Sequence, residues 1–501
     1  MGYVIGIDGG TESLRARLFD LEGRSLGTHA VPYETRFAPG ARAEQDPRAW
    51  WEALGSAVRG ALAEAGVAKE AVDALALDTT CCTVVALDAA GEPLRPAILW
   101  MDMRAAREAE EVLATQDPAL ILNGAGAGPV SAEWMIPKAL WLARHEPEIF
   151  ARASTIAEYQ DYLNLHLTGR RVASLNNAAV RWHYRSGIGI PQTLLAALGL
   201  EALAEKWPAE FLAPGTVIGP LTPHAAAHLG LTPRTLVVQG GADAFIGMIG
   251  LGVRRPGELA LITGSSHLQF GVSPAPIHVR GLWGTYADAV YPGRHILEGG
   301  QTSTGSIIAW LRRLGGGLDL ERLNQEAARL PIGAEGLLAL DHFQGNRTPY
   351  TDARARGTVI GLSLHHGPAH LFRAFIEAIS LGTRLIIDRM REAGLVIEEI
   401  VAGGGATRSP LWLQIHADAA GVPIRVPDIA EAPALGSAIL AAVGAGHFPS
   451  IDAAIDAMVR PGQRIEPIAE HRAEYDALLE RYTRLYETLR RFREESAQGS
   501  R

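Results

Sequence analysis

Three short turns combine glycine with hydroxyl-bearing residues, and turns of this composition can bind phosphate groups. They lie at residues 9–13, 263–266 and 403–407, each after an apolar run. Glycine lets backbone N–H groups come close to an anion. One such turn is weak evidence, because turns favour these residues in any case. Three of them, in the order hairpin, hairpin and strand-to-helix turn, predict a site for a nucleoside triphosphate.

The three turns predict different parts of that site. We expect the first two to hold phosphates, and the third to pass close to the purine and ribose because glycine leaves no side chain in the way. The expected binding residues are Gly10, Thr11, Ser13, Thr263, Gly264, Ser265, Ser266, Gly404, Gly405 and Ala406.

Two aspartates lie where a phosphoryl-transfer enzyme would need them. Asp8 directly precedes the first turn, where a phosphate-bound Mg²⁺ is within reach; the alternative is an ordinary hairpin with a solvated carboxylate. Asp243 follows a strand at a strand-to-helix junction. It is either a helix N-cap or a general base that accepts a hydroxyl proton, and one residue can serve both purposes.

Other candidates could line a substrate pocket. Cys81-Cys82 ends a strand, and small cysteines beside a ligand are weighed against simple core packing. Trp100 follows an apolar strand and could instead belong to the core. The polar groups of Glu298–Gln301 could bind sugar hydroxyls or cap the helix that follows.

Composition narrows the class of protein. The chain has 501 residues, 48% hydrophobic and 20% charged, so two globular domains are expected. A net charge of −9 means that the chain has no excess of positive charge with which to bind nucleic acid or an anionic membrane. Two adjacent cysteines, a strand at residue 3 and no long apolar run predict a cytoplasmic protein without a signal peptide or membrane span. P-loop and dinucleotide fingerprints are missing from the sequence.

The order of elements predicts an α/β fold in two halves, each opening with a hairpin, and a nucleotide in the cleft between them. We expect strands at 3–8, 14–20, 24–34 and 72–77, and again at 236–238, 259–262, 267–272 and 400–402. Helices are expected at 47–65, capped by Asp46 with Pro47 at its first position, and at 103–116, 133–145, 158–168, 368–394, 409–420 and 433–445. The predicted domains are 1–247 and 248–501, the second ending in a charged helix, 467–497, that we interpret as solvated.

Taken together, the motifs resemble the FGGY family of carbohydrate kinases across nearly the full length. The similar segments are Gly6-Ile7-Asp8-Gly9-Gly10-Thr11-Glu12-Ser13, Glu44-Gln45-Asp46-Pro47, Trp100-Met101-Asp102-Met103-Arg104, Gly241-Ala242-Asp243-Ala244 and Gly403-Gly404-Gly405-Ala406. The resemblance implies two actin-like (ribonuclease-H-like) domains with the active site in the cleft between them. It also implies ATP with Mg²⁺ and phosphorylation of a sugar hydroxyl.

Further segments resemble the ribulokinase branch of this family. They are Asp78-Thr79-Thr80-Cys81-Cys82-Thr83, Glu133-Trp134-Met135-Ile136-Pro137-Lys138-Ala139-Leu140, Glu158-Tyr159-Gln160-Asp161 and Glu298-Gly299-Gly300-Gln301. Arg181 aligns with a sugar-binding lysine of that branch, and its forked guanidinium differs from a lysine point charge. Thr407-Arg408-Ser409 replaces a usual asparagine, so Ser409 or Gln414 is expected to contact the purine; Gly305 completes the expected nucleotide-binding residues.

From these observations we predict an ATP-dependent ketopentose kinase that converts ribulose to ribulose 5-phosphate. Asp8 and Asp243 would serve Mg²⁺, Asp243 would be the base, and the sugar would contact Cys82, Trp100, Arg181, Asp243 and Glu298. The alternatives are a kinase for xylulose, ribitol or erythrulose, an actin- or chaperone-type ATPase, and a sugar-responsive transcriptional regulator. The expected partners are the sugar and ATP, with no nucleic acid or membrane; a homodimer is compatible with the sequence.

Overall fold

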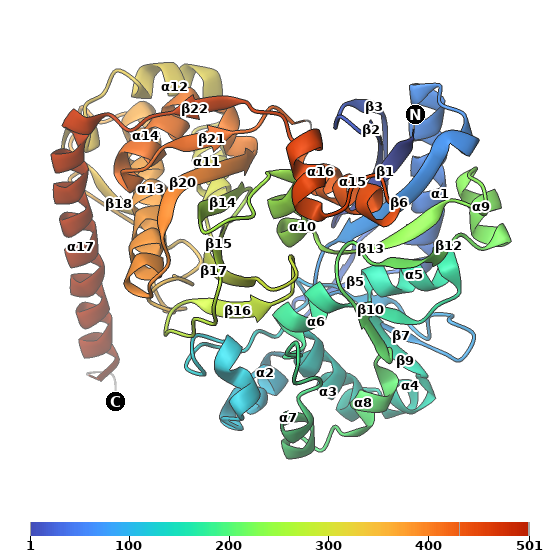
Figure 1. The fold of residues 1–501 in the computed structure, drawn as a ribbon. Helices are drawn as coiled ribbons and strands as arrows, with labels where there is room; N and C mark the ends of the chain where they lie inside the picture. Colours follow the sequence, from blue (N-terminus) through green and yellow to red (C-terminus); the bar gives the residue numbers. More distant parts are fainter. Residues whose placement is uncertain (1, 430, 499–501) are drawn as a thin grey trace. The chain divides into compact units, whose positions relative to one another are not determined.

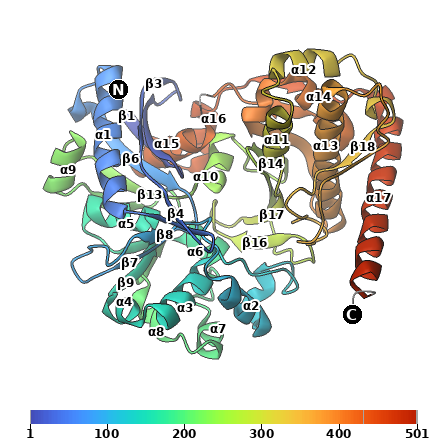
Figure 2. The ribbon, with the colours of Figure 1, turned by 180° about the vertical axis from the view of Figure 1, so that it is seen from behind.

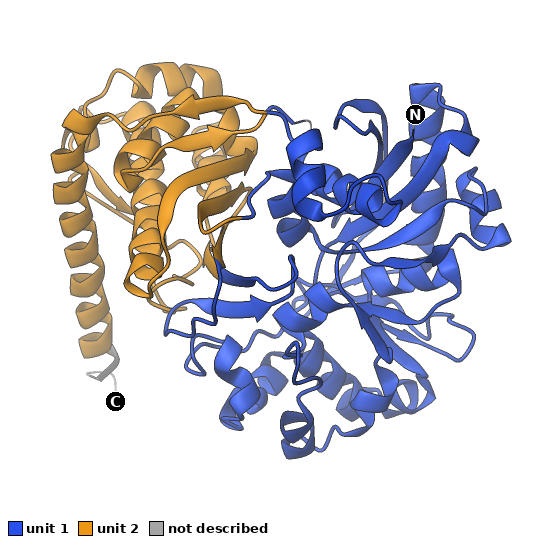
Figure 3. Cartoon of the chain, in the orientation of Figure 1, with its two compact units in different colours: residues 1–254, 273–297, 428–460 blue, residues 255–272, 298–427, 461–501 orange. Residues whose placement is uncertain are grey.

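The computed structural model describes residues 2–429 and 431–498. The chain combines strands and helices throughout its length (Figure 1 and, from behind, Figure 2). The chain divides into two compact units (Figure 3). Unit 1 comprises residues 1–254, 273–297 and 428–460, and unit 2 comprises 255–272, 298–427 and 461–501. Both units are discontinuous in sequence, and the predicted boundary at residue 247 remains a prediction.

The main sheet of unit 1 begins with the hairpin predicted from the first turn. β1 and β2 pair antiparallel, whereas β6 runs parallel to both β1 and β13. The sheet order is β12-β13-β6-β1-β2-β3. Its strands are β1 (Tyr3–Gly9), β2 (Ser13–Asp20), β3 (Ser25–Pro32), β6 (Val72–Thr79), β12 (Val217–Pro220) and β13 (Leu236–Ala242).

Helices pack against this sheet because its strands carry buried apolar residues. Helix α1 (Pro47–Ala65), capped by Asp46 as predicted, packs on β2 and β3; α15 (Ala432–Gly444) packs on β1 and β6. The second contact needs a glycine, since a Cβ at Gly6 would lie 1.8 Å from the carbonyl oxygen of Ala434. A chain segment from beyond residue 430 is thereby seated against the first strand.

Smaller elements complete unit 1. A second sheet has the order β4-β5-β8-β7-β9, and β10 pairs with β11. These strands are β4 (Arg36–Ala38), β5 (Arg42–Gln45), β7 (Val84–Leu87), β8 (Ala97–Ile98), β9 (Thr155–Glu158), β10 (Val172–Ser174) and β11 (Glu210–Leu212). Strand β16 (Trp283–Ala287) also lies in this unit but belongs to neither of these sheets. The helices are η1 (Lys69–Ala71), α2 (Ala106–Ala114), η2 (Pro118–Leu122), α3 (Met135–His145), α4 (Pro147–Arg152), α5 (Tyr159–Thr168), α6 (Leu175–Arg181), α7 (Gln192–Ala197), α8 (Ala202–Lys206), α9 (Pro223–Leu229), α10 (Asp243–Gly250) and α16 (Ile451–Met458).

Unit 2 repeats the arrangement of the first sheet, as the sequence predicted. β14 and β15 form an antiparallel hairpin, and β20 runs parallel to both β14 and β21. The strands are β14 (Gly257–Thr263), β15 (His267–Ser273), β17 (His295–Gln301), β18 (Leu338–Leu340), β19 (Thr358–Ile360), β20 (Ile397–Gly404), β21 (Ile424–Val426) and β22 (Gln463–Ile465). The helices are α11 (Gly305–Leu314), α12 (Leu320–Ala327), η3 (Ala334–Gly336), α13 (Pro368–Glu392), η4 (Gly405–Arg408), α14 (Pro410–Ala420), η5 (Ala469–His471) and α17 (Arg472–Gln498).

The C-terminal helix is not the solvated tail that its charge predicted. One face of α17 buries Tyr475, Leu478, Tyr482 and Tyr486 at helical spacing. The ring of Tyr486 stacks on that of Tyr350 with centroids 3.9 Å apart. The high charge of the tail therefore masked, in the sequence, an apolar stripe at positions i, i+3, i+7 and i+11, counted from Tyr475. This stripe packs α17 on the rest of unit 2.

Candidate functional site

Three carboxylates meet at one edge of the main sheet of unit 1. Asp8 on β1 is in register with Asp78 on β6, and Asp78 is in register with Gly241 on β13. Asp243 follows two residues after Gly241, at the start of α10. The carboxyl ends of parallel strands face the same edge of a sheet, where α/β proteins place their ligands. The arrangement therefore gathers negative charge at a binding edge.

Burial raises the pKa values of all three carboxylates. Burial raises the pKa of Asp8 to about 7, with Asp243 and Glu431 adding to the rise and Arg15 opposing it. Burial, together with the charge of Asp8, holds the pKa of Asp78 well above its usual range. Burial also raises the pKa of Asp243 to about 6. Such a cluster favours a bound cation or a retained proton.

Asp78 has an incompletely satisfied side chain. It is fully buried, its Oδ2 accepts a 2.7 Å hydrogen bond from the Ser437 hydroxyl on α15, and its Oδ1 has no partner among the described residues. A buried oxygen without a partner is costly in free energy. Three convergent oxygen ligands are what Mg²⁺ prefers, so the residues fit this ion.

The structure corrects one alternative for Asp243. The N-cap of α10 is Ala242, with φ −68° and ψ 136°, and Asp243 is the first helical residue. The Oδ1 atom of Asp243 accepts a 2.7 Å hydrogen bond from the N–H of Ala244. The N-cap interpretation is therefore wrong, because the cap lies one residue earlier and has no side-chain acceptor. The remaining carboxylate oxygen is compatible with a general base.

The first turn lies at the tip of the β1–β2 hairpin. The N–H of Gly10 donates to the carbonyl oxygen of Ser13 at 3.0 Å and closes the turn. The indole N–H of Trp100 donates to Oγ1 of Thr11 at 3.0 Å. Trp100, partly exposed, thus contacts the predicted phosphate turn and is not a buried core residue. Arg15 on β2 forms an ion pair with Glu431 and supplies positive charge nearby.

A buried carboxylate organises the predicted sugar loop. Glu158 accepts hydrogen bonds from the backbone N–H of Cys82 at 2.9 Å, from Nδ2 of Asn177 at 2.9 Å and from Nε1 of Trp182 at 2.6 Å. Cys82 itself has a φ of +69°, which is unusual for a residue with a side chain. Glu158 therefore fixes a strained loop residue and the segment around Arg181 with one side chain.

Lys138 anchors the same loop from the other side. It is fully buried, and its Nζ donates to the carbonyl oxygens of Cys82 at 2.7 Å and of Leu99 at 2.5 Å. Burial lowers the pKa of Lys138 to about 8. This lysine joins the Cys82 loop to the strand that leads into Trp100, so two predicted sugar contacts share one support.

Arg181 is the last residue of α6. Its guanidinium lies 5.5 Å from the ring centroid of Trp134, and its Nη1 donates to the hydroxyl of Tyr286 at 3.0 Å. Arg181 is therefore a partly buried helix residue and not an exposed arginine on a surface turn. The packing holds the guanidinium plane in place, as a specificity residue requires.

Glu298 belongs to unit 2, on β17. It is fully buried, and Arg347 donates to its Oε1 at 2.5 Å. The neighbouring Gln301 donates to Oδ2 of Asp341 and to the carbonyl oxygen of Ile379, both at 2.9 Å. Neither side chain caps α11, whose N-cap is Thr304. The helix-cap alternative is therefore wrong.

The second and third turns lie together in unit 2. Gly264, Ser265 and Ser266 are exposed at the tip of the β14–β15 hairpin. A Cβ at Gly305 would lie 2.4 Å from the Gly264 carbonyl oxygen, so this glycine lets α11 begin against the tip. The Thr263 hydroxyl donates to the Gly403 carbonyl oxygen at 2.9 Å, which joins the tip to the third turn. Thr263 thus supports both turns.

The two predicted purine contacts make hydrogen bonds within unit 2. The Ser409 hydroxyl donates to Asn324 and accepts from the N–H of Trp412 at 3.1 Å, where it caps α14. Nε2 of Gln414 donates to Oδ1 of Asp418 at 2.8 Å. The role of both residues at the purine stays a prediction. Gly405 and Ala406, with Gly404 at φ +104°, form the turn beside them.

Sequence reasoning missed four residues that shape these sites. They are Asp78, Lys138, Glu158 and Glu431. Asp78 ends a buried strand as Asp8 does, and this strand-end position is a signal that could have identified it. The other three depend on contacts between distant segments, which no local spacing reveals.

Comparison with known proteins gives one consistent family. The model of the N-terminal domain of the FGGY family of carbohydrate kinases matches residues 3–250, and that of its C-terminal domain matches 259–445. The chain is 33% identical to a ribulokinase of Geobacillus thermodenitrificans, over 97% of this chain and 94% of that protein. It is 30% identical to the solved xylulose kinase of Rhodospirillum rubrum, with a TM-score of 0.87 over 98% and 99% of the two chains. A solved xyloylose kinase from Brucella ovis is 27% identical, with a TM-score of 0.89 over 98% and 100%.

The chain belongs to the FGGY family of carbohydrate kinases, and it is an enzyme of that class with the two-domain α/β fold. The predicted family and fold class are confirmed. A kinase of this family uses ATP as its phosphoryl donor. Within residues 2–429 and 431–498, no helix is both long and apolar enough to cross a membrane.

Proposed function

We propose that this carbohydrate kinase transfers the terminal phosphoryl group of ATP to the terminal hydroxyl of a ketopentose, with ribulose as the substrate. The position of Asp243 carries this proposal: it begins α10 beside Asp8 and Asp78 at the carboxyl edge of the sheet. With a pKa of about 6, the Asp243 carboxylate is ionised at neutral pH, and its pKa is still close enough to the working pH for it to accept a proton.

The chain's own residues divide the work. Asp243 accepts the proton of the sugar hydroxyl as the oxygen attacks phosphorus. Arg181 donates hydrogen bonds to sugar oxygens, and the loops held by Glu158 and Lys138 set the shape of the pocket around Cys82 and Trp100. Glu298 is our further candidate for a sugar contact. The hydroxyl and glycine residues of the three turns bind ATP, as assigned from the sequence.

Mg²⁺ fits the acidic edge. Asp8 and Asp243 were expected to serve the ion, and Asp78 adds a third oxygen-bearing side chain to the same edge. When bound, the ion would neutralise phosphate charge during the transfer. The carboxylates gain a counter-charge, which favours their ionised forms over the protonated ones.

The support for ribulose is the 33% identity to a ribulokinase together with the Cys82 loop and its Glu158 anchor. A second candidate is xylulose, favoured by the 30% identity to the solved xylulose kinase. Ribitol and erythrulose are the remaining small-molecule alternatives. We place the enzyme in the cytoplasm, and a homodimer is the assembly to test.

A coupled ADP-release assay tests the proposal. The panel is D- and L-ribulose, D- and L-xylulose, ribitol, erythrulose and glycerol, each with ATP and Mg²⁺. The highest kcat/KM on a ribulose enantiomer supports the proposal; a higher value on xylulose supports the second candidate. Turnover of ATP that is independent of any sugar in the panel contradicts both.

Arg181 gives a second test of the sugar assignment. Arg181→Ala should lower kcat/KM for the best sugar by about 1.5–3 kcal/mol, the size of a lost hydrogen bond to a charged group. The KM for ATP should stay unchanged. Arg181→Lys should change the ranking of pentuloses. A wild-type ranking and efficiency in both variants would place Arg181 outside the pocket.

A further inference from the structure

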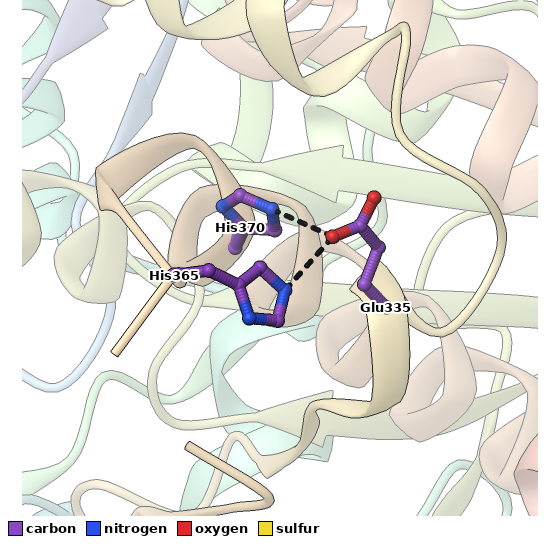
Figure 4. Close-up of side chains that lie close together, drawn as sticks. All are labelled: Glu335, His365 and His370. Atoms are coloured by element: carbon purple, nitrogen blue, oxygen red, sulfur yellow. Dashed lines mark hydrogen bonds and ion pairs between the residues drawn. The ribbon is translucent and has the colours of Figure 1, made fainter. Parts of the chain in front are cut away.

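A group of metal-ligating side chains lies in unit 2 apart from all residues assigned above. Figure 4 shows Glu335, His365 and His370 pointing toward one another. Glu335 lies in η3, His365 in the loop after β19, and His370 in the first turn of α13. Three segments separated in sequence thus contribute one ligand atom each.

The distances fit coordination by one ion. Oε2 of Glu335 lies 3.0 Å from Nε2 of His365 and 3.3 Å from Nε2 of His370. Ligands of a tetrahedral ion with bonds of about 2.0–2.1 Å are separated by about 3.4 Å. All three ligand atoms lie within 4.8 Å of one another. A small shift of the carboxylate would place an ion at bonding distance from all three.

The backbone holds the carboxylate in this position at a conformational cost. Ala334 and Glu335 have φ values of +43° and +56°, although neither is glycine. The turn is anchored on its far side, where the Gly333 N–H donates to the buried Glu377 carboxylate at 3.1 Å. Such strain persists only where surrounding contacts impose it, and it gathers at functional positions.

We infer that Glu335, His365 and His370 bind a divalent transition-metal ion, with Zn²⁺ the best match to two imidazoles and one carboxylate. The side chains of His365 and Glu335 are 57% and 42% exposed, so water reaches the ion and completes its coordination. The ion joins η3, the loop after β19 and the start of α13. It acts as a clamp on the fold of unit 2.

The surrounding hydrogen bonds define what binding changes. Nδ1 of His365 lies 2.6 Å from the Ser363 hydroxyl, which can accept its hydrogen when Nε2 binds the ion. Nδ1 of His370 accepts from the Gly367 N–H at 3.1 Å, so Nε2 carries the hydrogen in the metal-free protein. Binding through Nε2 requires the neutral tautomer with its hydrogen on Nδ1, and that tautomer loses the hydrogen bond from the Gly367 N–H. The site is therefore one of moderate affinity, weakened by acid.

His366 supports the loop without joining the cluster. Its Nδ1 accepts from the Ser363 N–H at 2.9 Å, and its Nε2 lies 3.3 Å from the Glu335 carbonyl oxygen. His366 is a positioning residue. His366→Ala should weaken metal binding less than loss of a ligand, and it should leave the coordination spectrum unchanged.

Calorimetric titration of the full-length protein with Zn²⁺ tests the site, with Mg²⁺ in large excess to occupy the aspartate cluster. Wild type should bind one ion that Glu335→Gln and His370→Ala each bind at least about tenfold more weakly. The matched control is His447→Ala, which removes another histidine–carboxylate pair, with Nε2 2.9 Å from Oδ2 of Asp73; among the described residues this pair has no third metal-ligating side chain. It should bind Zn²⁺ as wild type does.

Two further measurements keep the test independent of folding. Co²⁺ should give the intense visible absorption of a four-coordinate ion in wild type and in His447→Ala, but not in Glu335→Gln. Zn²⁺ should raise the melting temperature of wild type more than that of Glu335→Gln, since a ligand bound only to the native state stabilises it. Equal Zn²⁺ affinity of wild type and Glu335→Gln, or no measurable Zn²⁺ binding by wild type, overturns the inference.

Discussion

Asp243→Asn should remove the acid limb of the pH–rate profile as well as most of the turnover. Burial raises the pKa of this carboxyl from 3.8 to about 6. The shift of about two units corresponds to about 3 kcal/mol in favour of the protonated form. A base with this pKa is about nine-tenths ionised at pH 7 and about one-tenth ionised at pH 5. The wild-type kcat/KM for sugar should therefore fall by up to about tenfold between these pH values, and by less to the extent that bound Mg²⁺ lowers the pKa of Asp243.

The assay must separate this titration from that of ATP, because phosphate groups also titrate near pH 6. We would measure kcat/KM for the best sugar at saturating ATP, with Mg²⁺ in excess throughout. Asparagine is nearly isosteric and still accepts from the Ala244 N–H through its side-chain oxygen. Turnover should fall by about 10²–10⁴-fold, and the residual rate should lose its dependence on this pKa.

A matched carboxylate serves as the control for that experiment. Asp73→Asn alters an aspartate of the same unit that pairs with His447 and lies outside the cluster. The Asp73→Asn variant should keep the acid limb of the wild-type pH–rate profile. If Asp243→Asn retained more than half of the wild-type turnover, or kept the same acid limb, Asp243 would not be the base.

Four other substitutions test the supports of the predicted sites and the packing of α17. Glu158→Gln places an NH₂ group against one of three hydrogen-bond donors. The kcat/KM for sugar should therefore fall by about 1–3 kcal/mol, while the KM for ATP stays near wild type. An unchanged kcat/KM for sugar would contradict the anchoring role of Glu158. Gly405→Val should raise the KM for ATP alone, since a Cβ at this position meets no atom closer than 3.8 Å. Gly404→Val should also lower the melting temperature, because a Cβ there would lie 2.0 Å from the Thr263 carbonyl oxygen. If Gly405→Val changed only the KM for sugar, the adenosine assignment would be refuted. Tyr482→Phe removes a 2.5 Å hydrogen bond to Asp341 and should destabilise the protein by about 1–3 kcal/mol in denaturant unfolding, whereas a solvated α17 would show no change.

Local patterns were enough to predict the elements on which the sites are built. The apolar runs on either side of the first and second turns predicted both hairpins, and Asp46 with Pro47 predicted the start of α1. These features depend on residues that are neighbours in sequence. The tail at 467–497 shows the limit of the same reasoning. Its arginines and glutamates dominate the composition, whereas four residues at helical spacing determine where it packs.

The supports of the sites could not be predicted in the same way, because they join segments far apart in sequence. Ser437 reaches Asp78 across 359 residues, and this contact exists only because α15 packs on β1 and β6. Gly6 permits that packing by omitting a side chain. A glycine in a strand is ambiguous in sequence, since it equally marks a bulge or a turn.

The buried ions of unit 1 explain how the sugar loop can be both strained and rigid. A positive φ at Cys82 and a buried charge at Lys138 are each unfavourable alone. Lys138 donates to the carbonyl oxygen of Cys82, and Glu158 accepts from its N–H, so both polar groups of the strained residue are satisfied by opposite charges. Each charge also lowers the electrostatic cost of burying the other. The loop conformation and these two buried charges therefore depend on each other, and a change in either should alter which sugar the pocket accepts.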